Sequence, residues 1–178
     1  MGKQFTEIDA STREFIETQK IFFVGTAAPD GRVNVSPKGM DTLRVLGSNR
    51  VVWLNLTGSG NETAAHLQES NRMTLMFCAF EGKPNILRLY GTASVIYAKD
   101  DAWADLIALF PPIAGARQII DVSVDLVQSS CGMAVPFMDF QSEREELKHW
   151  AEKQGSEKIE EYWSRKNRYS LDGKPTGM

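Results

Sequence analysis

The sequence VVWLNLTGSGNETAAHL, residues 51–67, passes from an apolar run rich in β-branched residues through a glycine-rich polar loop into the start of a helix. Such a loop directs backbone N–H groups and small polar side chains towards one place. The first N–H groups of a helix have no partner within it, and the helix dipole favours an anion there. A second polar cluster, NVSPKG at residues 34–39, ends another predicted strand. Together the two segments predict a site for a phosphorylated cofactor.

The composition limits the class of protein. With 178 residues, 42% of them hydrophobic and 24% charged, the chain is sufficient for one domain with a substantial core. Its net charge of −3 gives no reason to expect nucleic acid or an anionic membrane as a partner. No apolar run approaches the roughly 20 residues of a membrane span, and residues 1–15 lack the apolar core of a signal peptide. Two cysteines are few for a disulfide scaffold, so we expect a cytoplasmic protein.

Alternating and β-branched segments predict a mainly β fold. The expected strands cover residues 21–28, 32–36, 50–56, 73–80, 86–97 and 117–128. The expected helices cover residues 9–19, 61–69, 100–110, 143–153 and 156–167, with Gly155 between the last two. Residues 29–31 (PDG) are a strong turn signal that joins the first two strands in a hairpin. Because no regular helices separate the strands, we expect a small closed antiparallel barrel with covering helices.

Short motifs along the chain point to a known family. They are DGR (30–32), SPKG (36–39), WLN (53–55), GSGN (58–61), LRLYGTA (87–93), QSSCG (128–132), KN (166–167) and SLDG (170–173). In order and spacing, from about residue 10 to the C-terminus, this set resembles the pyridoxamine 5′-phosphate oxidase-related FMN-binding proteins. The resemblance implies a six-stranded antiparallel split β-barrel of Greek-key type with peripheral helices. It also implies a homodimer with one FMN in each of two clefts at the subunit interface.

The same resemblance implies how the chain is divided and which residues meet the cofactor. We expect a single domain over residues 1–178, with a C-terminal helical extension from about residue 142 to residue 178. Val35, Ser36 and Lys38 would lie along the flavin ring and ribityl chain, and Asn61 and Thr63 would hold the phosphate. The full set of implied cofactor contacts is Asn34, Val35, Ser36, Lys38, Trp53, Asn55, Ser59, Asn61, Thr63, Arg88, Gln128 and Ser130.

The remaining assignments come from other strands. Trp53 and Asn55 would face the ring or the phosphate. Gln128 and Ser130 would reach the flavin from the end of the last strand, and Arg88 would lie on the strand that lines the interface.

Two departures from the oxidases bear on function. Where the oxidases carry an Arg-Lys pair at the helix start, this chain has Glu62 and Thr63. A carboxylate repels a phosphate unless it faces away, so neutral donors must do more of the binding. The tail also lacks the Arg-x-His with which the oxidases hold pyridoxal phosphate. This argues against oxidation of pyridoxamine phosphate itself.

Several of these residues also allow a simpler interpretation as structural or solvent-exposed residues. The glycine-rich loop is either a phosphate site or a plain connection in which Asn61 caps the helix. Lys38 is either a cofactor ligand or a solvated turn lysine, and Arg88 either contacts the cofactor or pairs with an acid across the interface. Asn61→Ala and Thr63→Ala are expected to weaken FMN binding while leaving the fold intact.

The histidines and cysteines offer no recognisable chemistry. His66 is expected on the solvent face of its helix, and Cys78 and Cys131 are expected to be packed thiols. Neither histidine forms a metal-ligand pattern, so no metal site is predicted. No general acid or base stands out, and the sequence names no catalytic residue.

The resemblance therefore implies a flavoprotein, and we expect it to transfer electrons or hydride between FMN and a small organic substrate. The alternative is a flavin or deazaflavin binding or carrier protein without turnover, which the same residues would serve. A haem ligand is poorly supported, since neither histidine lies in the cofactor motifs. Residues 111–117, mostly apolar with one cation, are a candidate substrate wall.

Overall fold

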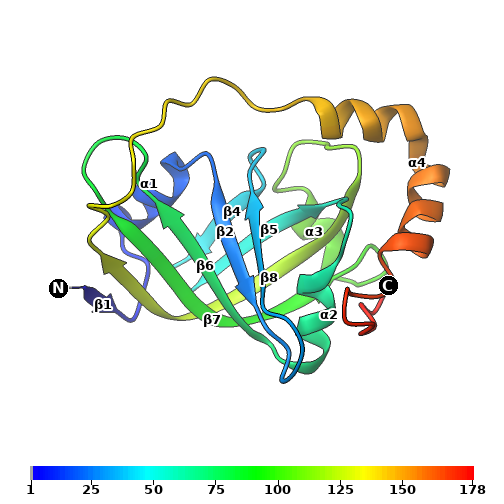
Figure 1. The fold of residues 1–178 in the computed structure, drawn as a ribbon, viewed down its shortest axis with the longest axis horizontal. Coiled ribbons are helices and arrows are strands. Elements are labelled where there is room, and N and C mark those ends of the chain that lie inside the picture. The colour runs from blue at the N-terminus through cyan, green and yellow to red at the C-terminus, as the bar shows by residue number, and fades with distance from the viewer. Residues whose placement is uncertain (1) are drawn as a thin grey trace.

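The computed structural model describes residues 2–178, which are organised around one antiparallel sheet of eight strands (Figure 1). The strands are β1 (Lys3–Phe5), β2 (Phe22–Thr26), β3 (Asn34–Lys38), β4 (Leu43–Gly47), β5 (Arg50–Leu56), β6 (Arg72–Cys78), β7 (Ile86–Ile96) and β8 (Ala116–Ser130). The helices are α1 (Ala10–Thr18), α2 (Glu62–Glu69), α3 (Trp103–Ile107) and α4 (Glu146–Lys166). All strand pairs are antiparallel. The predicted mainly β, antiparallel class is confirmed.

The sheet is open, whereas the strand pattern predicted a closed barrel. Its order is β3-β2-β6-β7-β8-β5-β4, with β1 beside β8, and within residues 2–178 no pairing joins β3 to β4. The edge strand β3 contains Pro37, which has no N–H to donate and is tolerated at a sheet edge. The sheet still curls, so that the rings of Phe22 in β2 and Trp53 in β5 meet edge to face with their centroids 6.2 Å apart.

All six predicted strands are present, β5 with the predicted bounds and the other five with shifted bounds, but β1 and β4 were not predicted. In β4, Leu43 and Val45 alternate with polar or exposed positions, and Val45 is the buried residue. Because an edge strand buries few side chains, only a short apolar alternation marks β4 in the sequence. The residues GSN at 47–49, before β5, were the turn signal that could have revealed this hairpin.

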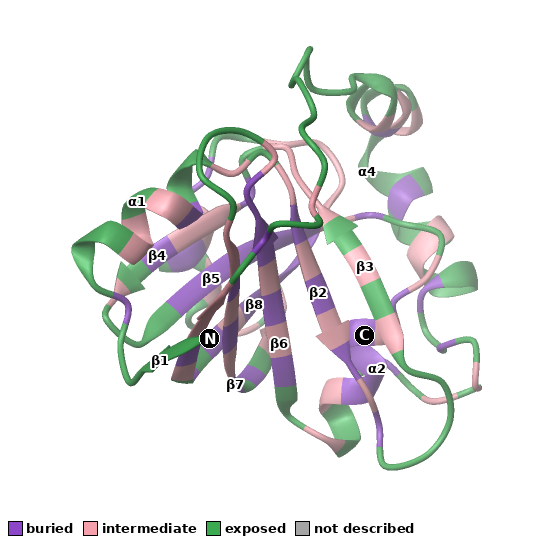
Figure 2. Cartoon of the chain, turned by 60° about the vertical axis from the view of Figure 1, so that its left-hand side comes forward, coloured by how far each residue is buried: buried purple, intermediate pink, exposed green. Residues whose placement is uncertain are grey.

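The core lies inside the curl of the sheet, and a smaller apolar cluster covers the outside of β5. Val51 and Trp53 belong to the inner cluster, whereas Val52 and Leu54 pack outward against Leu106 of α3 and its neighbours. Figure 2 shows the resulting alternation of buried and half-buried residues along β2 and β6. Since β5 is buried on both faces, the loop that follows it starts from a rigid position.

The C-terminal part returns to the sheet by a long path. Residues 131–145 cross from the end of β8 to α4 at the other side of the molecule, and the chain end folds back beside α2 (Figure 1). Within α4, Gly155 has φ 72° and breaks the helical backbone where the sequence predicted a boundary between two helices. No helix in the described part of the chain is both long and apolar enough to span a membrane.

Candidate functional site

Alternate residues of β3 form one wall of a cleft. Asn34, Ser36 and Lys38 project to the same face because side chains repeat every second residue in a strand. The cleft has a volume of about 570 Å³, within the usual range for small-ligand sites. Opposite β3 stand the end of β5, the loop at 57–61, the start of α2 and residues 166–171 of the tail. The implied cofactor residues that line it are Asn34, Ser36, Lys38, Asn55, Ser59, Asn61 and Thr63.

Helix α2 presents unpaired backbone donors to this cleft. Within residues 2–178, the N–H groups of Glu62, Thr63 and Ala64 have no hydrogen-bond partner, and the Asn61 side chain does not cap the helix. Thr63 Oγ1 accepts a hydrogen bond of 3.3 Å from Asn34 Nδ2, which ties α2 to β3. The helix start therefore offers three donors and a positive dipole end to a ligand.

Glu62, which the sequence marked as repulsive to a phosphate, has a partner in the tail. Both of its carboxylate oxygens accept from the backbone N–H of Leu171, at 3.0 and 3.1 Å. The acid that replaces a basic residue at the helix start thus helps to fasten the C-terminal segment.

Lys38 and Arg117 line the cleft without an acidic partner, beside a third cation, Lys166. Lys38 Nζ donates to Asn55 Oδ1 at 3.1 Å, and Arg117 Nη1 donates to the carbonyl of Gly60 at 3.0 Å and to Asn167 Oδ1 at 2.7 Å. Neither Lys38 nor Arg117 takes part in any of the ion pairs found in residues 2–178. Burial, and secondly the charge of Arg117, lowers the pKa of Lys38 to about 8. Burial also lowers the pKa of Arg117 to about 10.

Asn61 lines the cleft, but its side chain already has partners. It is 2% exposed and forms a reciprocal amide pair with Gln118, with distances of 2.8 and 3.3 Å. Asn61→Ala would leave the buried Gln118 amide unsatisfied, at a cost of about 1–3 kcal/mol. Asn61 is therefore not a side-chain cap of α2, and we expect Asn61→Ala to lower the stability of the fold as well as the affinity for FMN.

Other implied residues lie elsewhere. The Trp53 side chain is in the core, and Val35 points away from the cleft with 66% of its surface exposed. Arg88, Gln128 and Ser130 form a separate polar cluster on β7 and β8. Within it Arg88 Nη1 donates to Ser130 Oγ at 3.1 Å, and Gln128 is the register partner of Arg88. In this chain the cluster does not line the cleft.

Two expectations about titratable side chains are wrong. His66 is buried, because α2 turns this face towards β2 and the ring Nδ1 lies 3.1 Å from Thr26 Oγ1. Cys131 is exposed, since it begins the loop after β8 instead of packing in the sheet. Cys78 is buried as expected. The described residues hold no group of three His, Cys, Asp or Glu side chains placed to bind a metal ion.

Part of the cleft was missed by sequence reasoning. The sequence placed Arg117 in a candidate substrate wall and not in the cofactor site. Gly58 and Gly60 belong to the glycine-rich loop that the sequence singled out, and the other lining residues outside the implied contacts are Glu62, Lys166, Tyr169, Ser170 and Leu171. The SLDG turn was noted in the sequence, but its partners are far away in the chain, so no local signal placed it over this cleft.

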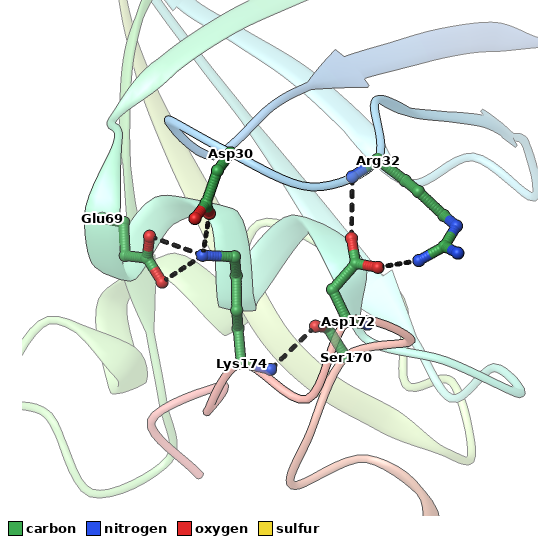
Figure 3. A network of polar contacts seen from close by, with 6 residues as sticks. All are labelled: Asp30, Arg32, Glu69, Ser170, Asp172 and Lys174. Atoms are coloured by element: carbon green, nitrogen blue, oxygen red, sulfur yellow. Dashed lines mark hydrogen bonds and ion pairs between the residues drawn. The ribbon is translucent and has the colours of Figure 1, made fainter.

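An ion-pair network holds the tail in place (Figure 3). Asp172 accepts from the Arg32 backbone N–H at 2.7 Å and pairs with the Arg32 guanidinium. The hydrogen bond from the Arg32 backbone N–H, and to a smaller extent the contact with its guanidinium, hold the pKa of Asp172 below its usual value. Lys174 Nζ lies 2.6 Å from Asp30 and 2.8 Å from Glu69. The tail is thus fixed to the β2–β3 loop and to the C-terminal end of α2, while the bond from Leu171 to Glu62 fixes it at the start of that helix.

The chain is similar in sequence to known proteins. Residues 8–131 match the family model described as pyridoxamine 5′-phosphate oxidase. The pyridoxamine 5′-phosphate oxidase family protein ustO of Aspergillus flavus is 39% identical over 140 residues, which cover 76% of this chain and 56% of that protein. The chain therefore spans little more than half the length of this curated relative.

Solved structures with low sequence identity share the fold. A single-residue variant of HupZ from Group A Streptococcus has a TM-score of 0.56 at 15% identity, covering 69% of this chain and 99% of that one. A putative pyridoxamine 5′-phosphate oxidase from Lactobacillus delbrueckii has a TM-score of 0.55 at 15% identity, covering 69% and 94%. HutZ from Vibrio cholerae, described as a heme storage protein, has a TM-score of 0.50 at 16% identity, covering 71% and 97%. At these identities the likeness concerns the fold alone.

Proposed function

The chain belongs to the pyridoxamine 5′-phosphate oxidase family, and on that premise we propose that it is an FMN-binding oxidoreductase. The observation that carries the proposal is the cleft in which Lys38 and Arg117 lie unpaired with any acid beside the free N–H groups of α2. Buried cations without counter-charges are costly, and an anionic ligand would supply the missing charge. A phosphorylated flavin fits this donor set and a cleft of about 570 Å³.

In this proposal the chain supplies position and charge. The N–H groups at the start of α2 and the Thr63 hydroxyl hold the phosphate, and Lys38 offers its cation to a further oxygen of the ligand. When bound, the flavin supplies the electron or hydride transfer to a small organic substrate. No histidine or cysteine lines the cleft among the described residues, which suits such transfer better than hydrolysis.

We expect the purified protein to be yellow and to carry close to one FMN per chain. The measurement is the flavin absorbance of the denatured protein against its peptide concentration, followed by titration of the stripped protein with FMN. A colourless protein that takes up no added FMN would contradict the proposal.

A flavin-binding protein without turnover is the second candidate. It is favoured by the absence of histidine and cysteine from the cleft lining in residues 2–178, and it would use the same ligands. Stopped-flow reduction of the FMN-loaded protein separates the two. Reduction by NADH or NADPH with reoxidation by an organic acceptor supports an oxidoreductase, whereas reduction by dithionite alone supports a carrier. A deazaflavin, titrated in parallel with FMN, tests the related cofactor.

We also propose that the protein works as a homodimer with FMN at the subunit interface. The polar cluster of Arg88, Gln128 and Ser130 does not line the cleft of its own chain and would serve the partner's cleft. Residues 131–145 expose apolar side chains along their path, and such patches mark interaction surfaces. The most exposed are Met133 and Phe137, both at 83%, followed by Met138 and Phe140.

Phe137→Glu should convert the dimer into a monomer and weaken FMN binding, because it places a charge in the proposed interface. Light scattering after gel filtration measures the mass, and titration measures FMN affinity. Val33→Glu is the matched control, since Val33 is also exposed, at 73%, but lies in the β2–β3 loop. A wild-type monomer that binds FMN normally would refute the shared site.

A further inference from the structure

The start of α2 lacks the positive charge that a phosphate site needs. Its first residues are Glu62, Thr63 and Ala64, and the only basic residue in the helix is His66. Glu62 brings a negative charge to the lining of the cleft. Three backbone donors must therefore be supplemented by a cation from another element if a phosphate dianion is to bind tightly here.

Arg117 stands where such a cation is required. It is the second residue of β8, is 5% exposed and lines the cleft. Its hydrogen bond to the carbonyl of Gly60 places the guanidinium against the loop that leads directly into α2. The bond to Asn167 fixes it from the other side.

The guanidinium is under-satisfied in this position. Both acceptors of Arg117 Nη1 are neutral oxygens, and its buried Nε has no hydrogen-bond partner in residues 2–178. An arginine has five N–H donors in a planar fork that matches phosphate oxygens. A buried cation with an unpaired donor costs folding free energy unless an anion accepts the hydrogen bond and balances the charge.

We propose that Arg117 is the principal charged ligand of the cofactor phosphate and replaces, from β8, the basic residues that the start of α2 lacks. This inference rests on the proposed FMN binding. Arg117 and Lys38 both line this one cleft, so a single ligand can contact both cations. An anion between them relieves their mutual repulsion.

A purely structural role is the competing explanation, because Arg117 also joins the loop to the C-terminal tail. Comparing FMN with riboflavin, which lacks the phosphate, separates the two roles. Arg117→Gln should lower FMN affinity about 10- to 100-fold, as expected for a lost charge-assisted hydrogen bond, and leave riboflavin affinity within about twofold. Arg117→Lys should restore part of the preference for FMN.

Arg50→Gln is the matched control, since Arg50 is half exposed and paired with Asp121 on the same sheet. It should change neither affinity. Equal losses of FMN and riboflavin affinity in Arg117→Gln would overturn the proposal and leave Arg117 as a support of the loop. A wild-type protein that binds neither flavin refutes the proposed function instead.

A second measurement covers the case in which Arg117→Gln does not fold. Inorganic phosphate should compete with FMN on the wild-type protein and compete less well on Arg117→Lys, whose ammonium retains the charge but loses the fork. Undiminished competition by phosphate in Arg117→Lys, or wild-type affinity for riboflavin equal to that for FMN, would overturn the assignment.

Discussion

Gly91→Ala should destabilise the protein by about 3 kcal/mol or more, because the new methyl group has no room. A Cβ at Gly91 would lie 1.9 Å from the carbonyl oxygen of Ser123 and 3.0 Å from the Cα of Val124. These are backbone atoms of β8 at a bulge in its pairing with β7. Relief of the clash requires separation of the two longest strands of the sheet, which carry Arg88 and Arg117. Chemical unfolding followed by circular dichroism measures the loss.

Gly47→Ala provides a matched control for this change. Gly47 also lies at a pairing irregularity, between β4 and β5, but a Cβ there would meet no atom within 4 Å. We expect its unfolding free energy to remain within about 0.5–1 kcal/mol of the wild type. Similar losses in both variants would show that strand propensity, and not the contact with Ser123, decides the outcome.

FMN affinity should fall roughly tenfold between pH 7 and pH 9.5. The pKa of Lys38 is lowered from 10.5 to about 8, chiefly by burial, so its charge is present below pH 8 and is lost as the pH rises through that value. The ligand phosphate stays a dianion over this range, because its second pKa is about 6. Arg117, with a pKa of about 10, keeps its charge and limits the size of the fall. Fluorescence titration with FMN at each pH is the measurement.

Lys38→Arg should remove most of this pH dependence, since a guanidinium in this cleft titrates well above pH 8, as the pKa of about 10 for Arg117 indicates. Lys38→Gln should bind FMN more weakly throughout and without a step near pH 8. A step of the same size in Lys38→Arg would assign the titration to another group.

Lys38 has the opposite effect on the stability of the ligand-free protein. Its folded pKa of about 8 lies below its unfolded value near 10.5, so the unfolded chain binds more protons between these values. Its contribution therefore raises the free energy of unfolding as the pH increases across this window. If Lys38 is buried in order to bind an anionic ligand, raising the pH should increase the stability of the ligand-free protein and decrease its affinity for FMN.

The sequence predicted best those elements whose residues follow a local pattern of polar and apolar positions. The alternation of Asn34, Ser36 and Lys38 indicated a polar strand face, and residues 51–67 indicated a strand, loop and helix that occur in that order. The order of short motifs led to the family. The polar alternation of the edge strand β3 was recognised, but the short strands β1 and β4 were missed because they bury little. Closure of the barrel was wrong because local alternation does not encode whether the two edge strands meet.

The amino-acid sequence by itself determined the β class, the family and a cleft built around the start of α2. Only the tertiary structure decided what each polar side chain in that cleft does. Asn61 pairs with Gln118, Glu62 with the backbone of Leu171, and Arg117 with Gly60 and Asn167, all across separations of 50 residues or more. Such pairings arise when curled strands and a returning tail bring distant groups out of water together, and neutral acceptors leave Arg117 unsatisfied. The spacing of these residues along the chain therefore does not predict these contacts.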